Sequence, residues 1–254
     1  MKILKILLCW IIFTSVQIIQ AQDKVRLEVE YSEYSIQTKN PYAPDTYSRA
    51  KLIWQDNISR FTSFYKEAKE ADPDFDGYSF NVNVYKDFEK NEMYARAMGY
   101  KDFNHIILDS LNIINWTIQD SAKYIKNMKS HLATTTFRDH EWKVWFTMEI
   151  PISDGPWKLT GLPGLILEAQ SINNADLSYK FVAENINYTQ NSTLRSPIHP
   201  FPDFDLINFD EYYQYILDRD TRMLRYVATQ QPVIEDITSR TCYSTMETCN
   251  CFPE

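Results

Sequence analysis

Apolar and polar residues alternate along much of this 254-residue chain. In the segment 25–31, apolar side chains occupy the odd positions and charged side chains the even ones. The same period of two runs through 78–84, 142–150, 165–170 and 177–181. Less regular strand-like segments lie at 47–54, 58–65, 94–98, 106–108, 113–118 and 124–136. A period of two predicts strands with one buried face.

Two places depart from this simple alternation. Tyr34 and Ile36 continue the first strand in the opposite phase, which predicts a bulge near Ser32-Glu33. The segment Phe64–Ala71 is rich in helix-forming residues, so a short helix competes there with the end of a strand.

The period changes from two to that of a helix near the C-terminus. Asn208 is suited to cap a helix, and Asp210 and Glu211 are suited to its first turn. The apolar residues then follow one stripe: Phe209, Tyr212, Tyr213, Ile216, Met223, Leu224 and Val227. The pattern predicts a helix over Phe209–Thr229, whose apolar face covers one side of the sheet.

Together these segments predict a mainly β fold. Many strands with polar turns and no alternating helices indicate an antiparallel, strongly curved sheet or partial barrel, with the one C-terminal α-helix packed on it. No repeat, Gly/Ser-rich linker or low-complexity tract divides the chain. We therefore expect a single β-rich domain over residues 22–254, which ends in a cysteine-containing tail.

The first 21 residues have the features of a secretory signal peptide. Lys2 and Lys5 precede the apolar run Ile6–Val16, and Ala21-Gln22 is a suitable cleavage point. No later stretch approaches the length of a membrane helix, so we expect no integral membrane segment in the mature chain. Removal of the leader leaves 24 basic against 34 acidic side chains. This acidic balance argues against nucleic acid and anionic membrane as partners.

Glycine and proline are concentrated in Pro151–Leu167, a segment that contains three of the five glycines and three of the 11 prolines. Asp154-Gly155-Pro156 and Leu162-Pro163-Gly164 both have the composition of turns. One interpretation is a rigid structural corner, with Trp157 packed on the core and a positive φ at Gly164. The other is a loop that presents a ligand- or partner-binding site. The candidate site residues are Gly155, Pro156, Trp157, Gly161, Leu162, Pro163 and Gly164.

This segment also carries a family resemblance. Residues 155–166, Gly-Pro-Trp-Lys-x-x-Gly-Leu-Pro-Gly-Leu-Ile, resemble the signature of the GLPGLI family of exported envelope proteins. The approach to the motif is similar as well, in Glu149–Asp154 and in Ala133–Arg138. The resemblance implies an exported, β-rich protein in the periplasm or cell envelope of a Gram-negative bacterium. It implies no settled activity and no catalytic residues.

Three cysteines remain after export, Cys242, Cys249 and Cys251. In an oxidising compartment they predict one local disulfide, with Cys242 as one partner, and one spare thiol. The alternative is a soft metal site built from the three thiolates.

The other candidate chemistry is sparse. The four histidines, His105, His131, His140 and His199, form no metal-ligand motif. Arg138-Asp139-His140-Glu141 has the composition of a solvated hairpin turn. The residues Asp72, Asp74 and Asp76 resemble the start of a calcium loop, but a plain acidic turn is the default interpretation. The common nucleophile, phosphate-binding and dinucleotide-binding motifs are absent from the sequence, and we expect no cofactor.

Three classes of function remain open. The first is a non-enzymatic envelope protein that binds an apolar small molecule inside a curved sheet, or binds an outer-membrane protein. The second is a metal-handling protein that uses the three cysteines. The third is a hydrolase with a site assembled from distant residues. A dry, aromatic-lined cavity would distinguish the first class from the third.

Overall fold

The computed structural model describes residues 25–37, 46–64, 82–96, 105–172, 177–190, 193–230, 243–244 and 249–250. The first strands are β1 (Arg26–Gln37), β2 (Thr46–Gln55), β3 (Ile58–Phe64), β4 (Asn83–Asp87), β5 (Glu92–Arg96) and β6 (His105–Ser110). After the short 3-10 helix η1 (Leu111–Ile113) come β7 (Thr117–Ile125), β8 (Met128–Phe137), β9 (His140–Thr147), β10 (Leu165–Ile172) and β11 (Leu177–Thr189). The last elements are β12 (Asp205–Ile207), helix α3 (Phe209–Gln230), β13 (Tyr243–Ser244) and β14 (Cys249–Asn250).

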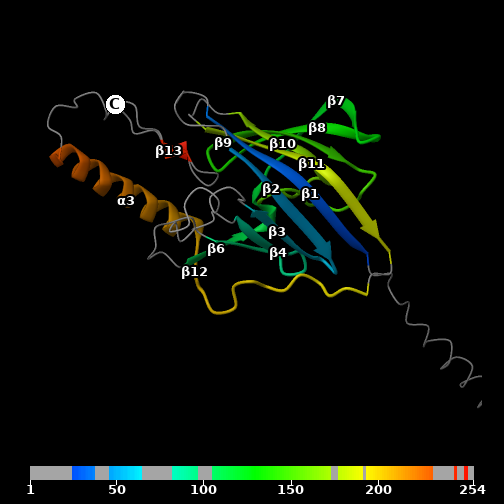
Figure 1. The fold of residues 1–254 in the computed structure, drawn as a ribbon, viewed down its shortest axis with the longest axis horizontal. Coiled ribbons are helices and arrows are strands. Elements are labelled where there is room, and N and C mark those ends of the chain that lie inside the picture. Colours follow the sequence, from blue (N-terminus) through cyan, green and yellow to red (C-terminus); the bar gives the residue numbers. More distant parts are fainter. Residues whose placement is uncertain are drawn as a thin grey trace, which may run out of the picture.

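Twelve strands form one sheet, in the order β12-β6-β5-β4-β3-β2-β1-β11-β10-β9-β8-β7 (Figure 1). All neighbours pair antiparallel except β12 and β6, which are parallel. The prediction of a mainly β, mostly antiparallel fold with one C-terminal helix is therefore confirmed. β13 and β14 form a separate two-stranded pair.

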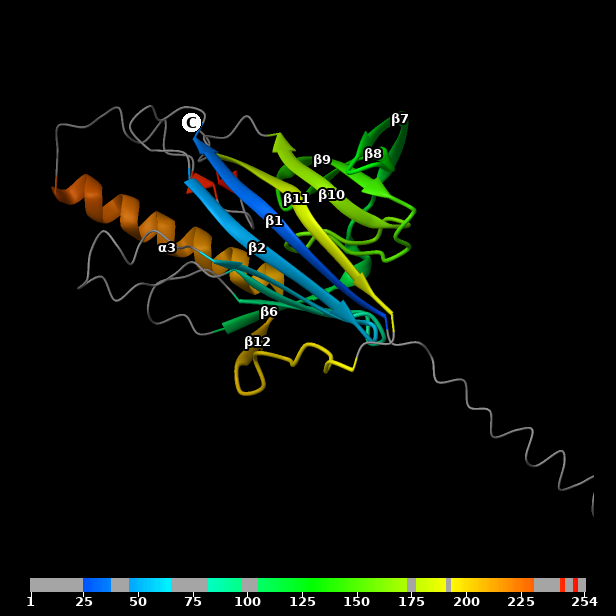
Figure 2. The same ribbon diagram turned by 45° about the vertical axis from the view of Figure 1, so that its right-hand side comes forward.

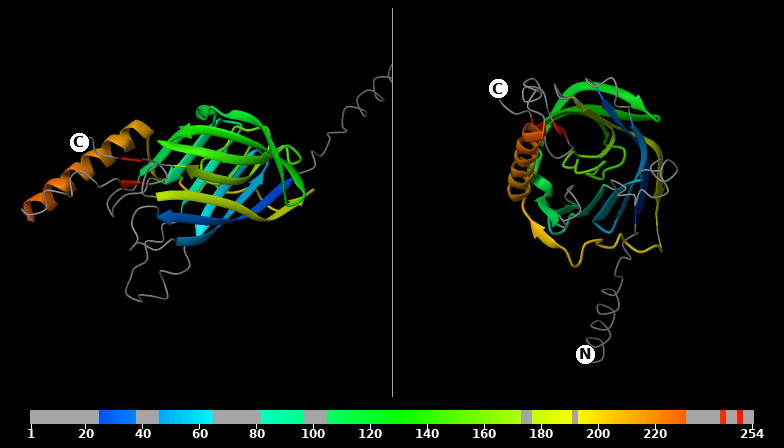
Figure 3. Two further views of the ribbon diagram at one scale, coloured as in Figure 1. Left: turned by 90° about the horizontal axis from the view of Figure 1, so that it is seen from above. Right: turned by 60° about the vertical axis from the view of Figure 1, so that its left-hand side comes forward.

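The sheet curls around its own interior without closing. Figure 2 shows the long strands β1, β2 and β11 crossing the molecule diagonally, and the end-on view in Figure 3 shows the sheet curving into a ring. β12 and β7 stand at opposite ends of the strand order, so no ladder joins them. The bulge predicted in β1 near Ser32 is wrong, because β1 pairs with β2 in unbroken register there. The pairing of β1 with β11 shifts between Glu30 and Tyr31, and the extra residue, Glu184, belongs to β11. Bulges bend and twist a strand, which suits a sheet of this curvature.

The core follows the alternation seen in the sequence. On β9, Trp142, Val144 and Phe146 are buried, while Glu141 and Lys143 between them are exposed. The inward rings stack on one another: Trp142 and Phe181 lie 6.5 Å apart between centroids. The concave side of the sheet is therefore an aromatic core.

Two predicted elements differ from the structure. The segment 113–118 is not one strand, because η1 ends at Ile113 and β7 begins only at Thr117. The segment 124–136 is interrupted by a two-residue hairpin turn, with positive φ at Lys126 and Asn127. A turn with positive φ at both central residues matches the twist of paired strands, and here lysine adopts it without a glycine.

Helix α3 ends one residue beyond its predicted end but packs differently. Asn208 caps it, because Glu211 N donates to Asn208 Oδ1 at 2.9 Å. Among the side chains of α3 that the structure describes, Tyr212 and Ile216 of its first half pack against Ile107 of β6. The helix then runs away from the sheet (Figures 1 and 3). The prediction that it lies across one side of the sheet is wrong, since the signature loop covers the concave side instead. Among the described helices, none has the length and apolar character needed to cross a membrane.

Candidate functional site

The Gly/Pro-rich signature lies inside the curve of the sheet (Figure 3). We call residues 148–164, between β9 and β10, the signature loop. Its two ends meet, because Leu165 N donates to Ile150 O at 3.1 Å and Ile166 N donates to Asp154 O at 2.9 Å. Every residue from Asp154 to Thr160 is buried. The loop therefore fills the space that a curved sheet would otherwise enclose.

Trp157 holds the loop in the aromatic core. Its side chain is 2 % exposed and stacks on Trp142, with ring centroids 5.7 Å apart. Phe137 packs on it at 5.7 Å. The expectation that Trp157 packs on the domain is confirmed. Its backbone has a φ of 52°, a left-handed conformation that is uncommon for so large a residue.

The glycines of the loop serve two different needs. Gly161 has a φ of 95°, so it supplies the left-handed conformation. A Cβ at Gly164 would lie 2.0 Å from Thr147 O, so this glycine allows a close approach of two backbone segments. The expectation of a positive φ at Gly164 is wrong, because Trp157 and Gly161 hold the positive φ values of this loop instead.

A buried ion pair fixes the loop to the sheet. Lys86 of β4 points inward, and its Nζ lies 2.5 Å from Asp154 Oδ1, with both side chains fully buried. Lys86 Nζ also donates to Gly155 O at 3.2 Å. Burial lowers the pKa of Lys86, and the Asp154 carboxylate opposes this in part. Burial also raises the pKa of Tyr31 well above its usual value, and the Asp154 charge adds to this.

A second set of charges joins the two ends of the sheet. Asp109 of β6 accepts from Arg138 of the β8–β9 turn at 2.6 Å and from Lys158 of the signature loop at 3.0 Å. Burial alone would raise the pKa of Asp109, but Lys158 and Arg138 outweigh it and hold that pKa below its usual value. Nearby, Trp116 Nε1 donates to Thr160 O at 2.7 Å. Side chains thus connect the sheet ends where no backbone ladder does.

The predicted solvated turn at residues 138–141 is wrong for two of its members. His140 is fully buried between the rings of Trp142 and Tyr179, at 6.1 and 5.9 Å. The Arg138 guanidinium lies 3.1 Å from the centroid of Phe209, at the start of α3. Both side chains therefore belong to the packing between the turn, the sheet and the helix.

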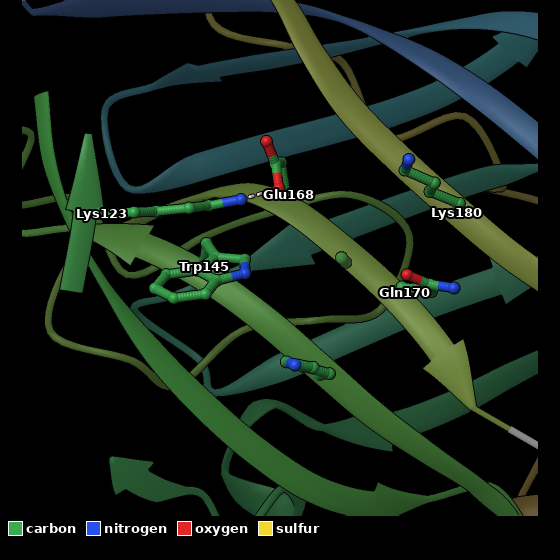
Figure 4. A pocket seen from close by; sticks show the side chains of 7 residues that line it. Lys123, Trp145, Glu168, Gln170 and Lys180 are labelled. Atoms are coloured by element: carbon green, nitrogen blue, oxygen red, sulfur yellow. Dashed lines mark hydrogen bonds and ion pairs between the residues drawn. The ribbon is translucent and has the colours of Figure 1, made fainter. Parts of the chain in front are cut away.

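A polar pocket lies on the outer face of the sheet, because its Trp145 alternates along β9 with the inward-facing Val144 and Phe146. Figure 4 shows the pocket and its lining side chains. Its cavity volume is about 180 Å³. The lining residues come from β7, β9, β10 and β11: Lys123, Lys143, Trp145, Glu168, Ala169, Gln170 and Lys180. We call it the Trp145 pocket. Trp145 points to the outer face, because its neighbours Val144 and Phe146 on β9 point inward, and its side chain is half-buried.

The Trp145 pocket carries a net positive charge. Lys123 Nζ lies 4.5 Å from the Trp145 ring centroid and 2.5 Å from Glu168 Oε2. Glu168 is the one carboxylate of the lining, against three lysines. In Figure 4, Lys123 reaches across from β7 toward Glu168, above Trp145, and Lys180 lies on the neighbouring strand β11. A cationic pocket with an aromatic base suits an anionic group.

A wider, more open pocket of about 450 Å³ lies where α3 meets the two ends of the sheet. Its lining includes Asp109, Arg138 and Phe209. These residues already contact one another: Arg138 binds Asp109 and lies over the ring of Phe209. We therefore assign this pocket to the packing between helix and sheet and not to a second binding site.

The structure sorts the predicted site residues into buried and exposed positions. Within the signature, Gly161 and Pro163 are exposed, and the other five candidates are buried: Gly155, Pro156, Trp157, Leu162 and Gly164. Cys242, Cys251 and the acidic turn at 72–77 lie outside the described residues. Cys249 begins β14, which pairs with β13. In the described part of the chain, His, Cys, Asp and Glu side chains form no group of three that could hold a metal ion.

Sequence reasoning missed the charged residues that matter most. Lys86 could have been found from the sequence, because it continues the phase of Val82 and Val84 and so falls on the buried face of β4. Lys123 and Trp145 belong to strands far apart in the pattern, so only the pairing of β7 with β8 and of β8 with β9 brings them together.

Comparisons with known proteins give limited matches. Residues 97–168, which include the whole signature, match a family model described as "Protein of unknown function (Porph_ging)". No curated protein matches the chain.

Solved structures are similar to this chain at low identity. Two crystal forms of PNGF-II match at 17 and 15 % identity, with TM-scores of 0.48 and 0.49, over 74 and 76 % of this chain. The chain spans about a third of PNGF-II, 32 and 33 % in the two forms. The complex of MucA and MucB from Pseudomonas aeruginosa matches at 10 % identity over 69 % of this chain and 54 % of the other, with a TM-score of 0.32. A putative outer membrane lipoprotein-sorting protein domain from Vibrio parahaemolyticus matches at 5 % identity over 67 and 87 %, with a TM-score of 0.29.

Proposed function

We propose that this chain is an exported, non-enzymatic binding protein of the Gram-negative cell envelope, which takes an acidic segment of an envelope-protein partner in the Trp145 pocket. The leader-like residues 1–21 support export. The signature at 155–166 supports placing the chain in the GLPGLI family, and the residues that match a family model of unknown function, 97–168, include that signature.

The occupied interior favours a partner over an apolar small molecule. A ligand carried inside the sheet would need the space that Trp157, Leu159 and Leu162 fill, each at most 2 % exposed. The interior charges are also enclosed, because Lys86, Asp154 and Lys158 are fully buried. Neither an apolar ligand nor a substrate has access to these groups without removing the signature loop.

The observation that carries the proposal is the composition and size of the Trp145 pocket. Its volume of about 180 Å³ is below the roughly 300–1,000 Å³ of typical small-molecule sites. It fits one side chain of a partner better than a free ligand. Lysine ammonium groups act as point charges for carboxylates, and tryptophan is a frequent anchor in protein interfaces. The three lysines of the pocket stand out in a chain whose formal net charge is −8.

A peptide titration tests this proposal. The purified mature protein is titrated at low ionic strength with a glutamate-rich peptide and with its glutamine counterpart. The double variant Lys143→Glu/Lys180→Glu should weaken binding of the acidic peptide by at least about tenfold, and added salt should weaken binding to the unchanged protein. The Trp145→Phe variant should lose the fluorescence change that accompanies binding.

The matched control is Lys129→Glu/Arg225→Glu, which makes the same change in charge at exposed positions outside the pocket lining. Equal weakening in both double variants would show a general charge effect and contradict the proposal. Equal binding of the glutamine peptide would also contradict it. Tighter binding of a polygalacturonate at the same lysines would assign the pocket to an anionic glycan instead.

A further inference from the structure

The Lys86–Asp154 pair holds an amine against a carboxyl group in a closed apolar setting. The Nζ–Oδ1 distance is 2.5 Å and both side chains are fully buried. Since a carbon–oxygen bond is about 1.2 Å long, Asp154 Cγ lies within about 3.7 Å of Lys86 Nζ. A nucleophile and a carboxyl carbon are thus near the distance at which they react.

The hydrogen bonds around the pair are distributed unequally. Lys86 Nζ lies 3.2 Å from Gly155 O and 3.5 Å from Leu159 O. The third and shortest contact of Nζ is its donation to Asp154 Oδ1 at 2.5 Å, so loss of the proton on this side leaves a lone pair that faces the carboxyl group. Asp154 Oδ1 also accepts from Gly155 N at 2.8 Å, whereas Oδ2 has no hydrogen-bond partner among the described residues. Oδ1 is therefore the oxygen that can take a proton from Lys86 and leave, and Oδ2 is the oxygen that remains on Cγ.

The burial of Lys86 favours the uncharged amine that the chemistry needs. Burial lowers the pKa of Lys86. In an apolar interior, transfer of the ammonium proton to the carboxylate turns two buried charges into a neutral amine and a neutral acid. By contrast, the second buried pair, Lys158 with Asp109, includes Arg138 on the same carboxylate, which keeps that group ionised.

We propose that Lys86 and Asp154 become joined by an intramolecular isopeptide bond. One ammonium proton passes along the Nζ–Oδ1 contact to Asp154 Oδ1, and the Lys86 lone pair that this frees attacks Asp154 Cγ. The bond from Cγ to Oδ1 then breaks, and Oδ1 leaves with the transferred proton and one of the two remaining amine protons as water, while Oδ2 stays as the amide oxygen. The step condenses an amine and an acid to an amide, so it needs no oxidant, reductant or cofactor. The product ties β4 covalently to the signature loop.

Mass spectrometry of the purified mature protein tests the proposal, and it is independent of partner binding. After reduction and denaturation, the protein should be about 18 Da lighter than its sequence requires, by one water. Protease digestion should give one branched peptide that contains both Lys86 and Asp154. Because the peptide map reads these residues directly, it does not depend on where the leader is cleaved.

The same digest contains its own control, since Lys158 and Asp109 should appear in unlinked peptides. The Lys86→Arg variant should have the full mass of its sequence. Linear peptides with free Lys86 and free Asp154 in the folded wild-type protein would overturn the proposal. That result stands whether or not the Lys86→Arg variant folds, because it is read from the unchanged chain.

Discussion

Trp157 and Gly164 stabilise the signature loop in opposite ways, one by filling space and the other by leaving it free. Trp157 adopts a left-handed backbone conformation, which costs about 1–2 kcal/mol for a residue with a Cβ. Burial of its ring against Trp142 and Phe137 offsets that cost, because a buried tryptophan contributes about 3–5 kcal/mol. Gly164 contributes nothing by its side chain, and its role is to leave room for Thr147 O.

The two glycine roles predict different costs for the same substitution. Gly164→Ala should destabilise the protein by about 3 kcal/mol, because its Cβ would lie 2.0 Å from a backbone oxygen that cannot move alone. Gly161→Ala should cost about 1 kcal/mol, since its nearest neighbour is 3.6 Å away and only its positive φ is unfavourable. Urea unfolding of both variants measures these costs. The reverse order would contradict the close approach of Gly164 to β9.

At the scale of elements, the ends of the sheet depend on Asp109. This carboxylate joins β6, the β8–β9 turn and the signature loop through Arg138 and Lys158. Removing one partner of a buried pair costs about 3–5 kcal/mol, because it leaves a buried charge without compensation. The pairing with these two cations should therefore make the packing of these three elements sensitive to acid.

The acid sensitivity can be measured with Asp109→Asn. The pKa of Asp109 is lowered in the folded protein, so its contribution is complete above its usual value of 3.8 and is lost as the pH falls through the lower folded value. The free energy of unfolding of the variant should lie below that of the wild type at pH 7, and the gap should narrow as the pH falls below 3.8. Other carboxyls, such as Glu33, are common to both proteins. A gap that stays constant with pH would contradict the assigned role of the carboxylate.

Elements with a regular period were predictable from the sequence, and irregular ones were not. The alternation at 142–150 gave β9 and its inward face, and the helical stripe gave the bounds of α3 to within one residue. The turn at Lys126-Asn127 was not predicted, because neither residue is the glycine that usually marks a positive φ. The direction of α3 was not predicted either. The helix was expected to cover one face of the sheet, but the signature loop covers the concave face.

The candidate site was likewise predictable from the sequence only in part. A Gly/Pro-rich segment marks a special backbone whatever its surroundings, so the signature loop was found from sequence. Its burial was only partly predictable, because it depends on the curvature of the whole sheet. The Trp145 pocket could not be found from sequence, since Lys123, Trp145 and Lys180 converge only through the pairing of five strands, β7 to β11.

At the scale of the whole molecule, the twelve-stranded sheet curves around the signature loop. The signature loop brings Trp157, Leu159 and two charged side chains into the interior, and these meet partners from distant strands. Under the proposed function, recognition takes place on the outer face, where the Trp145 pocket lies. The central claim is therefore that the signature stabilises the fold and does not itself present a ligand.

The thermal and urea unfolding of Trp157→Ala tests this claim most directly, with Tyr124→Ala as the control because Tyr124 is an aromatic residue of β7 that is 76 % exposed. Trp157→Ala should lose about 3–5 kcal/mol of unfolding free energy, and Tyr124→Ala should change it by no more than about 0.5 kcal/mol. An unchanged stability of Trp157→Ala, together with loss of partner binding, would show that the signature loop is the binding site and would contradict the account.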